Sequence, residues 1–127
     1  MTRIYPAIAA SLGMLTIILG AFGAHALKDQ LEPESLQSFE TGVRYMMFHV
    51  LAILLINFSP LLSQRSKTRI SKLFLIGILL FSGSIFVIAT GLIQAKTIWF
   101  ITPLGGLFFV LGWLIATLSF LKSNDKN

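Results

Sequence analysis

Four side chains with acid–base or cationic chemistry fall in or beside long apolar runs of this sequence. They are His25, Arg44, Tyr45 and His49. Tyr45 and His49 are four residues apart, so they would share one face of a helix. Ionisable groups at membrane depth are costly and by default indicate a functional site. These four side chains are therefore the candidate for a ligand-binding polar site near the outer end of a membrane bundle.

Three kinds of chemistry suit such a cluster. Neutral imidazole is a common ligand, so His25 and His49 would hold a haem or a metal between helices. Arg44 with the two histidines would instead bind an anionic lipid or a small anion. The third is a proton relay, although relays commonly include Asp or Glu, and none lies in the apolar runs. Two histidines without a third ligand are a weak signature, so we predict no metal and no cofactor.

A purely structural interpretation explains the same residues and is the one that we favour. His25 is three residues from Lys28 and would sit at the membrane interface. Arg44 would pair with Glu40 one helical turn earlier, a weak exposed ion pair. His49 would satisfy its nitrogens with hydroxyl or backbone groups across a helix contact.

The elements that position these residues follow from where the charges lie. Of the 127 residues, 55% are hydrophobic and only 12% are charged, about half of the ~25% charged residues of soluble domains. Four runs of 20 or more residues contain no charged residue at all, and about 20 apolar residues span a bilayer as a helix. The sequence therefore predicts one all-α integral membrane domain over residues 1–127, with spans at about 4–27, 45–62, 73–93 and 98–121.

Composition also excludes other classes. Only about 35 residues lie outside the four runs, too few for a soluble domain. The net charge of +5 comes from basic residues beside the spans, where they set orientation, so we expect no nucleic-acid partner. Cysteine is absent, which excludes thiol chemistry. The sequence has no G-x-S-x-G, H-E-x-x-H or P-loop motif, and we predict that the protein is not an enzyme.

Lys and Arg are distributed unequally between the two sides of the predicted bundle. The N-terminus, the loop Gln64–Lys72 and the C-terminal tail share one side and carry seven basic residues, against three on the other side. Cytoplasmic segments carry the excess of Lys and Arg. We therefore expect a cell-membrane protein with both termini in the cytoplasm.

The outer loop between the first two spans predicts a short amphipathic helix over residues 33–42. Pro33 suits a first helical position, and Leu36, Phe39 and Val43 recur at helical spacing. Its polar face lacks the basic residues of a lipid anchor. We expect a surface helix that covers the outer end of the bundle like a lid and continues through Gly42 into the second span.

Small residues at intervals of seven predict how the spans pack. Close backbone approach through small residues is the usual basis of helix association in lipid, and a period of seven indicates a left-handed bundle. The predicted packing residues of the first, third and fourth spans are Gly13, Gly20, Gly77, Ser84, Gly91, Gly105 and Gly112. Ser82 and Ser84 are interpreted as packing residues bonded to backbone carbonyls, and Trp113 must find a partner for its indole N–H.

Several segments, in the same order along nearly the whole chain, together resemble one family of small bacterial membrane proteins. The segments are Gly20–Leu27, Thr41–His49, Leu80–Phe86 and Thr102–Trp113. The family is domain of unknown function 423, also called uncharacterised protein family 0382. The resemblance implies a four-span inner-membrane or plasma-membrane protein and assigns no reaction, ligand or catalytic residue.

Together these observations predict a non-enzymatic structural, lipid-interacting or accessory membrane protein, with Arg44 and His49 as the functional contacts. Membrane lipids are the expected partners, with a second copy or another membrane protein as further candidates. A small oligomeric transporter or channel is the alternative, and a bis-histidine haem or metal protein through His25 and His49 is the third.

Overall fold

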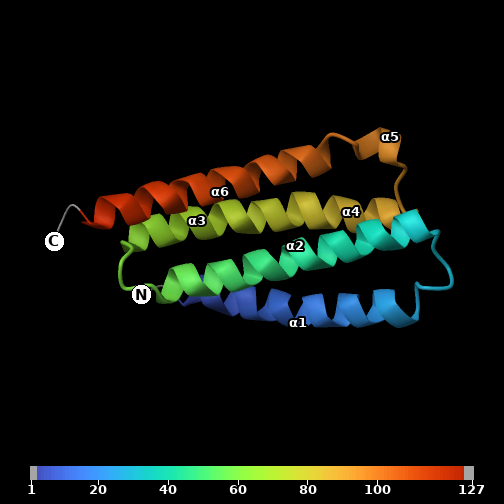
Figure 1. Cartoon of the computed structure of the whole chain (residues 1–127), viewed down its shortest axis with the longest axis horizontal. Helices are drawn as coiled ribbons and strands as arrows, with labels where there is room; N and C mark the ends of the chain where they lie inside the picture. The colour runs from blue at the N-terminus through green and yellow to red at the C-terminus, as the bar shows by residue number, and fades with distance from the viewer. Residues whose placement is uncertain (1–2, 125–127) are drawn as a thin grey trace.

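The computed structural model describes residues 3–124, and these residues are helical with no strand. Figure 1 shows the long helices running side by side. Four helical segments are long and apolar enough to cross a membrane, which confirms the predicted all-α class with four spans. Lys126, which the orientation count includes, lies outside the described residues. The helices are α1 (Ile4–His25), α2 (Pro33–Phe58), α3 (Gln64–Gly77), η1 (Ile78–Ser82), α4 (Gly83–Ala89), α5 (Ala95–Ile98) and α6 (Ile101–Asn124).

The helix ends follow from local sequence. Pro33 begins α2 in the first turn, where its missing N–H costs little. Pro60 favours extended backbone in the residue before it, and α2 accordingly ends at Phe58, with Ser59 as an extended C-cap. Ser63 caps α3 by accepting a hydrogen bond from a backbone N–H. Gly91 has a φ of 77°, a conformation that favours glycine, and lies in the turn after α4.

The first and fourth spans lie within three residues of their predicted bounds, but the second and third begin earlier than the uncharged runs that predicted them. The second begins at Pro33 instead of residue 45, and the third begins at Gln64 instead of residue 73. Charged side chains on these extra turns, such as Glu40 and Lys72, are exposed. Helices therefore continue past the apolar run into the headgroup region, where charges remain in water.

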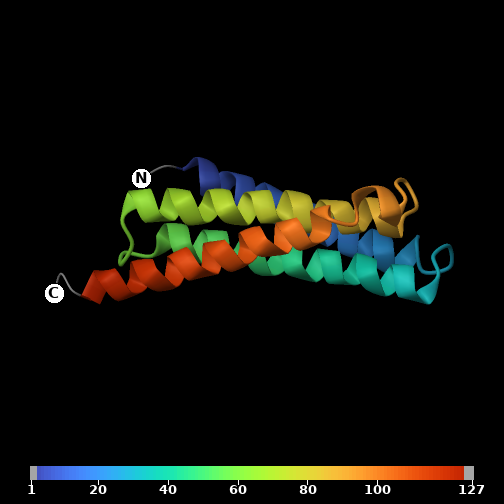
Figure 2. The ribbon, with the colours of Figure 1, turned by 90° about the horizontal axis from the view of Figure 1, so that it is seen from above.

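The four spans form an open arrangement. α2 packs against α1 on one side and against α3, η1 and α4 on the other, while α6 packs against α3 and η1. Figure 1 shows α1 and α6 on opposite sides of the molecule, and Figure 2 shows the same four helices from above. The span α3–η1–α4 is continuous over Gln64–Ala89. The left-handed twist expected from the heptads stays a prediction.

Residues 33–42 do not form a separate surface helix over the end of the bundle. They are the first turns of α2, and their apolar side packs laterally against neighbouring spans. The Phe39 ring lies 5.0 Å from the Phe86 ring of α4 and packs against Gly23 of α1. The carbonyl of Gly42 accepts a hydrogen bond of 2.8 Å from the Ser82 hydroxyl. The lid prediction was wrong because the apolar stripe of this segment faces α1 and α4.

α3 and α6 pack closely because a glycine on each helix leaves space for a phenylalanine ring from the other. The space beside Gly77 is filled by the ring of Phe109, and the space beside Gly112 is filled by the ring of Phe74. Both rings are buried. Each helix therefore offers one small residue to receive one aromatic ring of its neighbour, and two of the predicted packing glycines, Gly77 and Gly112, lie at this contact.

The other predicted packing residues differ in how close they lie to a neighbour. Gly105 faces the backbone of residues 80–81 directly, and Gly13 and Gly20 lie in ordinary contact distance of α2 side chains. Ser84 bonds the Phe81 carbonyl at 3.0 Å and the Thr102 hydroxyl. Gly91 is a correction: it is exposed in a turn and faces no neighbour within 4 Å. Its place in the heptad does not matter because α4 has already ended.

A π-helical turn, η1, allows two neighbouring residues to face different spans. Ser82 donates to the Gly42 carbonyl of α2, while the Phe81 ring lies 5.4 Å from Phe109 of α6. Such turns insert an extra residue into a helix and re-aim the side chains around it. The interpretation of Ser82 as a packing residue bonded to a backbone carbonyl is confirmed.

The outer surface of the spans is apolar. Large hydrophobic side chains are exposed on every span, including Met14, Leu55, Leu79 and Val110, whose exposed fractions are 65%, 74%, 70% and 62%. Exposed apolar surface of this extent would be unfavourable in water and matches the hydrocarbon of a bilayer.

Substitution of Gly77 by Ala should destabilise the bundle. The added methyl group would meet the Phe109 ring, which cannot move freely because it stacks on His49 at 3.6 Å. Overpacking of this kind costs about 1–3 kcal/mol. We expect a lower unfolding midpoint in detergent, measured by circular dichroism during titration with a denaturing detergent.

The matched control is Gly83→Ala, since Gly83 has no neighbour within 4 Å of an added methyl group. Alanine is favoured over glycine in helices by about 1 kcal/mol. This variant should unfold at the midpoint of the unsubstituted protein or above it. Equal destabilisation by both substitutions would contradict the assignment of the Gly77–Phe109 contact.

Candidate functional site

His49 is the buried titratable side chain at the centre of the molecule, with 4% of its surface exposed. Its Nδ1 lies 2.7 Å from the Tyr45 carbonyl oxygen, and its Nε2 lies 3.1 Å from Nε1 of Trp113. A carbonyl only accepts and an indole N–H only donates. Both bonds form together only when Nδ1 carries a proton and Nε2 carries none. The arrangement therefore assigns neutral imidazole, which suits a low-dielectric interior.

Aromatic rings enclose the imidazole. Phe109 stacks on it with ring centroids 3.6 Å apart and planes 9° apart. Phe74 approaches edge-on at 5.0 Å. These rings occupy the spaces beside Gly112 and Gly77, so the α3–α6 contact and the environment of His49 form one unit. We call His49, Phe74, Phe109 and Trp113 the central cluster.

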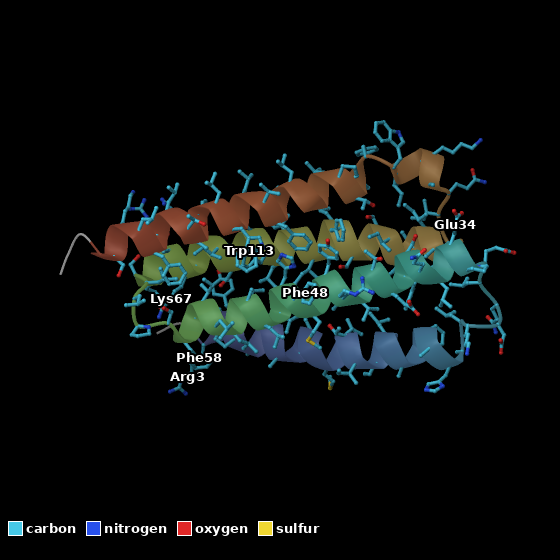
Figure 3. All side chains as sticks on the ribbon, viewed as in Figure 1. Arg3, Glu34, Phe48, Phe58, Lys67 and Trp113 are labelled. Atoms are coloured by element: carbon cyan, nitrogen blue, oxygen red, sulfur yellow. The ribbon has the colours of Figure 1, made fainter. Side chains whose placement is uncertain are left out.

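The central cluster lies halfway along the spans. Gly13 faces Val50 and Gly20 faces Val43, so α1 and α2 are antiparallel and the middle of α1 is level with His49. Trp113 is at the middle of α6, as Figure 3 shows for its labelled side chain. The sequence prediction of a site near the outer end therefore misjudged the depth of His49, because α2 begins a full three turns earlier than expected.

His25 takes no part in the central cluster. It is the last residue of α1 and is exposed. From the facing pairs above, it is level with Ser38 of α2, about 16 Å from His49 along the helix axis at ~1.5 Å per residue. The structure does not bring the two histidines together, so a shared haem or metal between them has no geometric basis.

Arg44 and Tyr45 also face different neighbours. The Tyr45 ring packs 5.1 Å from Phe81 of η1, and its carbonyl supports His49. Arg44 is exposed on the side of α2 that faces α1. Adjacent helical residues point about 100° apart, so the four predicted site residues separate into His49 with Tyr45, Arg44 alone and His25 alone.

Arg44 lines a groove between α1 and α2. The groove has a volume of about 510 Å³. Apart from Arg44 and Thr16, its walls come from apolar side chains and glycine, and Thr16 uses its hydroxyl to bond the Leu12 carbonyl of its own helix. We call it the Arg44 groove; its lining is Thr16, Ile17, Gly20, Ala21, Val43, Arg44, Met47 and Phe48.

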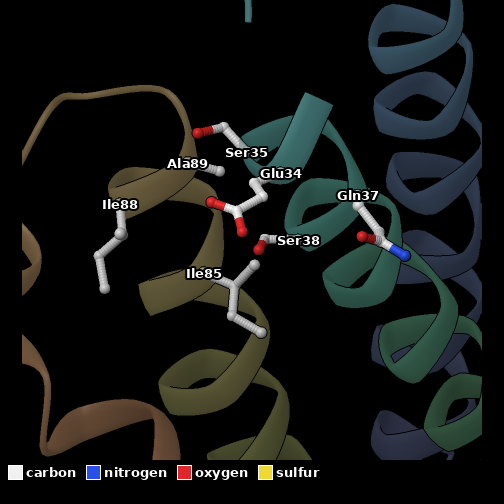
Figure 4. A pocket seen from close by; sticks show the side chains of 7 residues that line it. All are labelled: Glu34, Ser35, Gln37, Ser38, Ile85, Ile88 and Ala89. Carbon is white, nitrogen blue, oxygen red and sulfur yellow. The ribbon is translucent and has the colours of Figure 1, made fainter. Parts of the chain in front are cut away.

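A second hollow lies between the first turns of α2 and the end of α4, and it is lined by both polar and apolar side chains. Figure 4 shows the Glu34 carboxylate there, beside the Ser35 and Ser38 hydroxyls and above the Ile85 side chain. Among residues 3–124, no group of three or more metal-ligating side chains comes together. The single carboxylate of this hollow is therefore not part of such a group.

The sequence reasoning missed the partners of His49. Trp113 was expected to need a hydrogen-bond acceptor, and this expectation is confirmed, but nothing in the sequence linked it to His49. Phe74 and Phe109 each lie three residues from a packing glycine of their own helix, and this spacing was the available signal. A further polar contact, from Asn57 to the Ser71 hydroxyl at 2.8 Å, joins α2 to α3 and was not predicted.

Four apolar helices with a buried, hydrogen-bonded histidine at mid-depth define a polytopic α-helical membrane protein. The family model "Protein of unknown function (DUF423)" matches residues 19–106. The chain belongs to this family, as the sequence resemblance implied.

Named relatives extend the match to nearly the full chain. A UPF0382 membrane protein of Haemophilus influenzae is 37% identical over 95% of this chain and 96% of its own length. The UPF0382 membrane protein YwdK of Bacillus subtilis is 34% identical over 94% of this chain and 98% of its own. A relative in Schizosaccharomyces pombe is 34% identical over 84% of this chain and 92% of its own. No solved structure matches the chain significantly.

The hydrogen bond between His49 and Trp113 can be measured by a double-mutant cycle of His49→Phe and Trp113→Phe. Interhelical polar contacts in membranes contribute about 0.6 kcal/mol on average and up to about 1.7 kcal/mol. We expect a coupling free energy in this range and a larger loss for each single variant, because each leaves one polar group buried without its partner.

Unfolding in mixed detergent micelles, followed by circular dichroism, provides the four free energies. The control cycle pairs His49→Phe with Trp99→Phe, since Trp99 is 67% exposed and lies in the loop region before α6. Its coupling energy should be zero within error. A zero coupling in the Trp113 cycle would contradict the assigned hydrogen bond.

Proposed function

We propose that this protein is a non-enzymatic, lipid-interacting component of the cell membrane, and that the Arg44 groove binds an anionic phospholipid. The observation that carries the proposal is an almost wholly apolar groove, at the depth of the hydrocarbon, that the Arg44 side chain borders. A phospholipid has this same combination of an anionic headgroup and an apolar chain.

The depth of Arg44 supports the proposal. It lies five residues from His49, about 7.5 Å from the centre of the spans at ~1.5 Å per residue. A guanidinium at this depth is costly unless it reaches the interface or meets an anion. A side chain that extends along the groove toward the headgroup region would do both, while Gly20 and Ala21 leave room for an acyl chain beside it.

The filled centre of the molecule favours this proposal over a transporter that acts within one chain. The central cluster occupies the mid-depth of the spans with rings in close contact. A transport path would therefore have to run between copies of the chain, and the exposed apolar sides of the spans would have to provide that contact. Membrane lipids are the partners that the described groove suits directly.

We further propose the plasma membrane as the location, with both termini in the cytoplasm. The basic residues support this orientation. Six described Lys and Arg residues lie at one end, which we call the basic end, against three toward the other, which also holds four acidic residues and which we call the acidic end. Figure 3 labels Arg3 and Lys67 at one end and Glu34 at the other. The basic end carries Arg3, Arg65, Lys67, Arg69, Lys72 and Lys122, and the acidic end carries Asp29, Glu32, Glu34 and Glu40.

The lipid proposal predicts that Arg44→Gln weakens binding of phosphatidylglycerol by about tenfold, the equivalent of about 1.4 kcal/mol. The loss follows from removal of a charge-assisted hydrogen bond. Native mass spectrometry of the full chain, released from micelles with phosphatidylglycerol or phosphatidylcholine added, measures it. Binding of phosphatidylcholine should change less.

The control is Lys28→Gln, which removes an exposed cation from the same half of the molecule but outside the groove. It should retain phosphatidylglycerol like the unsubstituted protein. Unchanged binding in Arg44→Gln, or an equal loss in both variants, would reject the groove as the lipid site. Circular dichroism of each variant checks that the fold is intact.

The orientation predicts that reporters fused at Asn127 behave as cytoplasmic. A fluorescent protein fused there should fluoresce in a bacterial host, and alkaline phosphatase fused there should be inactive. Fusion of the same reporters after Lys28, between the first two spans, should reverse both results. An active phosphatase at Asn127 would overturn the orientation.

A further inference from the structure

The basic end of the molecule contains a hollow between α3 and α6, with a volume of about 640 Å³. Ligand sites are concave and typically have volumes of about 300–1,000 Å³. Most of its walls are polar, in contrast to the Arg44 groove. The polar side chains that line it are Ser63, Ser66, Arg69, Ser119, Lys122 and Ser123.

Two cations from different helices converge on this hollow. Arg69 comes from the second turn of α3 and Lys122 from the last turn of α6. None of the lining residues in the described chain is acidic. The Arg guanidinium binds phosphate oxygens through two parallel N–H groups, and Lys binds them as a point charge. The charges of the hollow therefore suit an anion with several oxygens.

The serines add hydrogen-bond donors around the same space. Ser63 is the N-cap of α3: its Oγ accepts from the Ser66 N–H at 3.2 Å and donates to the Ser66 hydroxyl at 3.1 Å. This leaves the Ser66 hydroxyl proton free to donate to a ligand. Ser119 is half-buried in the wall from α6. Hydroxyl donors beside two cations are typical partners of phosphate oxygens.

The apolar side of the hollow indicates the kind of molecule that carries the phosphate. Ile115 is half-buried and lies about two turns of α6 nearer the middle of the spans than Lys122. Leu62, which is 6% exposed, adds a second apolar wall from the loop before α3. A soluble phosphate would gain nothing from these walls. A phospholipid would place its headgroup against the basic and hydroxyl residues and its first methylene groups against the apolar ones.

We propose that this hollow, the Arg69–Lys122 pocket, binds the phosphate headgroup of an anionic phospholipid from the leaflet at the basic end. Basic pockets between transmembrane helices are a known form of headgroup recognition. The pocket is separate from the Arg44 groove, which lies between α1 and α2 and about 7.5 Å toward the acidic end from the centre. Each site is therefore tested by its own variants.

The test is native mass spectrometry of the full chain with phosphatidylglycerol, using the double variant Arg69→Gln and Lys122→Gln. We expect one bound phosphatidylglycerol to be lost at concentrations where the unsubstituted protein retains it, a loss of about tenfold or more in apparent affinity. A second variant, Ser119→Leu, keeps both cations but fills the hollow, and it should lose the same lipid.

The matched control is the double variant Arg65→Gln and Lys67→Gln. It removes two positive charges from the same end, at positions that do not line the hollow. It should retain the lipid, since a general attraction to the basic end would be lost equally in both double variants. Equal losses in the two double variants, or full retention in Ser119→Leu, would overturn the pocket as a specific site.

A final measurement separates the lipid from a free phosphate. Inorganic phosphate at millimolar concentration should not displace phosphatidylglycerol from the unsubstituted protein. Displacement would overturn the lipid assignment and identify a soluble anion as the ligand. Loss of lipid in Arg44→Gln but not in the Arg69 and Lys122 variant would reject this inference alone, and the converse would reject the Arg44 groove alone.

Discussion

The absence of water in hydrocarbon is the constraint on which the rest of this structure depends. A polar group at mid-membrane must find its partner within the protein. His49 and Trp113 meet this requirement together, since the imidazole donates to a carbonyl of its own helix and accepts from the indole. The bond requires α6 to lie close to α2 at this depth, and the close approach of α3 and α6 makes that possible.

That close approach of α3 and α6 depends on a glycine lying opposite each phenylalanine ring. Gly77 and Gly112 receive the rings of Phe109 and Phe74, and both rings then contact the imidazole. Packing and hydrogen bonding are therefore coupled, because a change that separates α3 from α6 would also expose the polar pair. Nearer the acidic end, the Ser82 hydroxyl of η1 donates a hydrogen bond to the Gly42 carbonyl and joins this span to α2.

α1 and the two ends of the molecule are less constrained. α1 packs mainly on α2. The Arg44 groove between these two helices therefore stays open along one side. The basic end holds cations and serines between α3 and α6, where α3 begins beside the end of α6. The proposed lipid sites thus occupy the places where helix packing leaves space and where charge remains beside apolar walls.

The sequence alone determined the class, the number of spans, the polarity of the two ends and the family. These properties depend on local composition, because a span needs only a run of apolar residues bounded by charged ones. It also pointed to small residues at helix contacts, and Gly77 and Gly112 lie at such a contact. Gly91 shows where the heptad pattern misleads, since a glycine that ends a helix has the same spacing as one that packs.

Only the tertiary structure decided which side chains meet. The spacing of Tyr45 and His49 predicted a shared face, but the rotation of α2 about its axis turned His49 toward α6 and Arg44 toward α1. Rotation and helix start are set by packing with distant segments, which no local pattern encodes. For the same reason His25 was grouped with His49 by sequence and separated from it by the fold: residues 33–42 extend α2 and shift His49 to mid-depth.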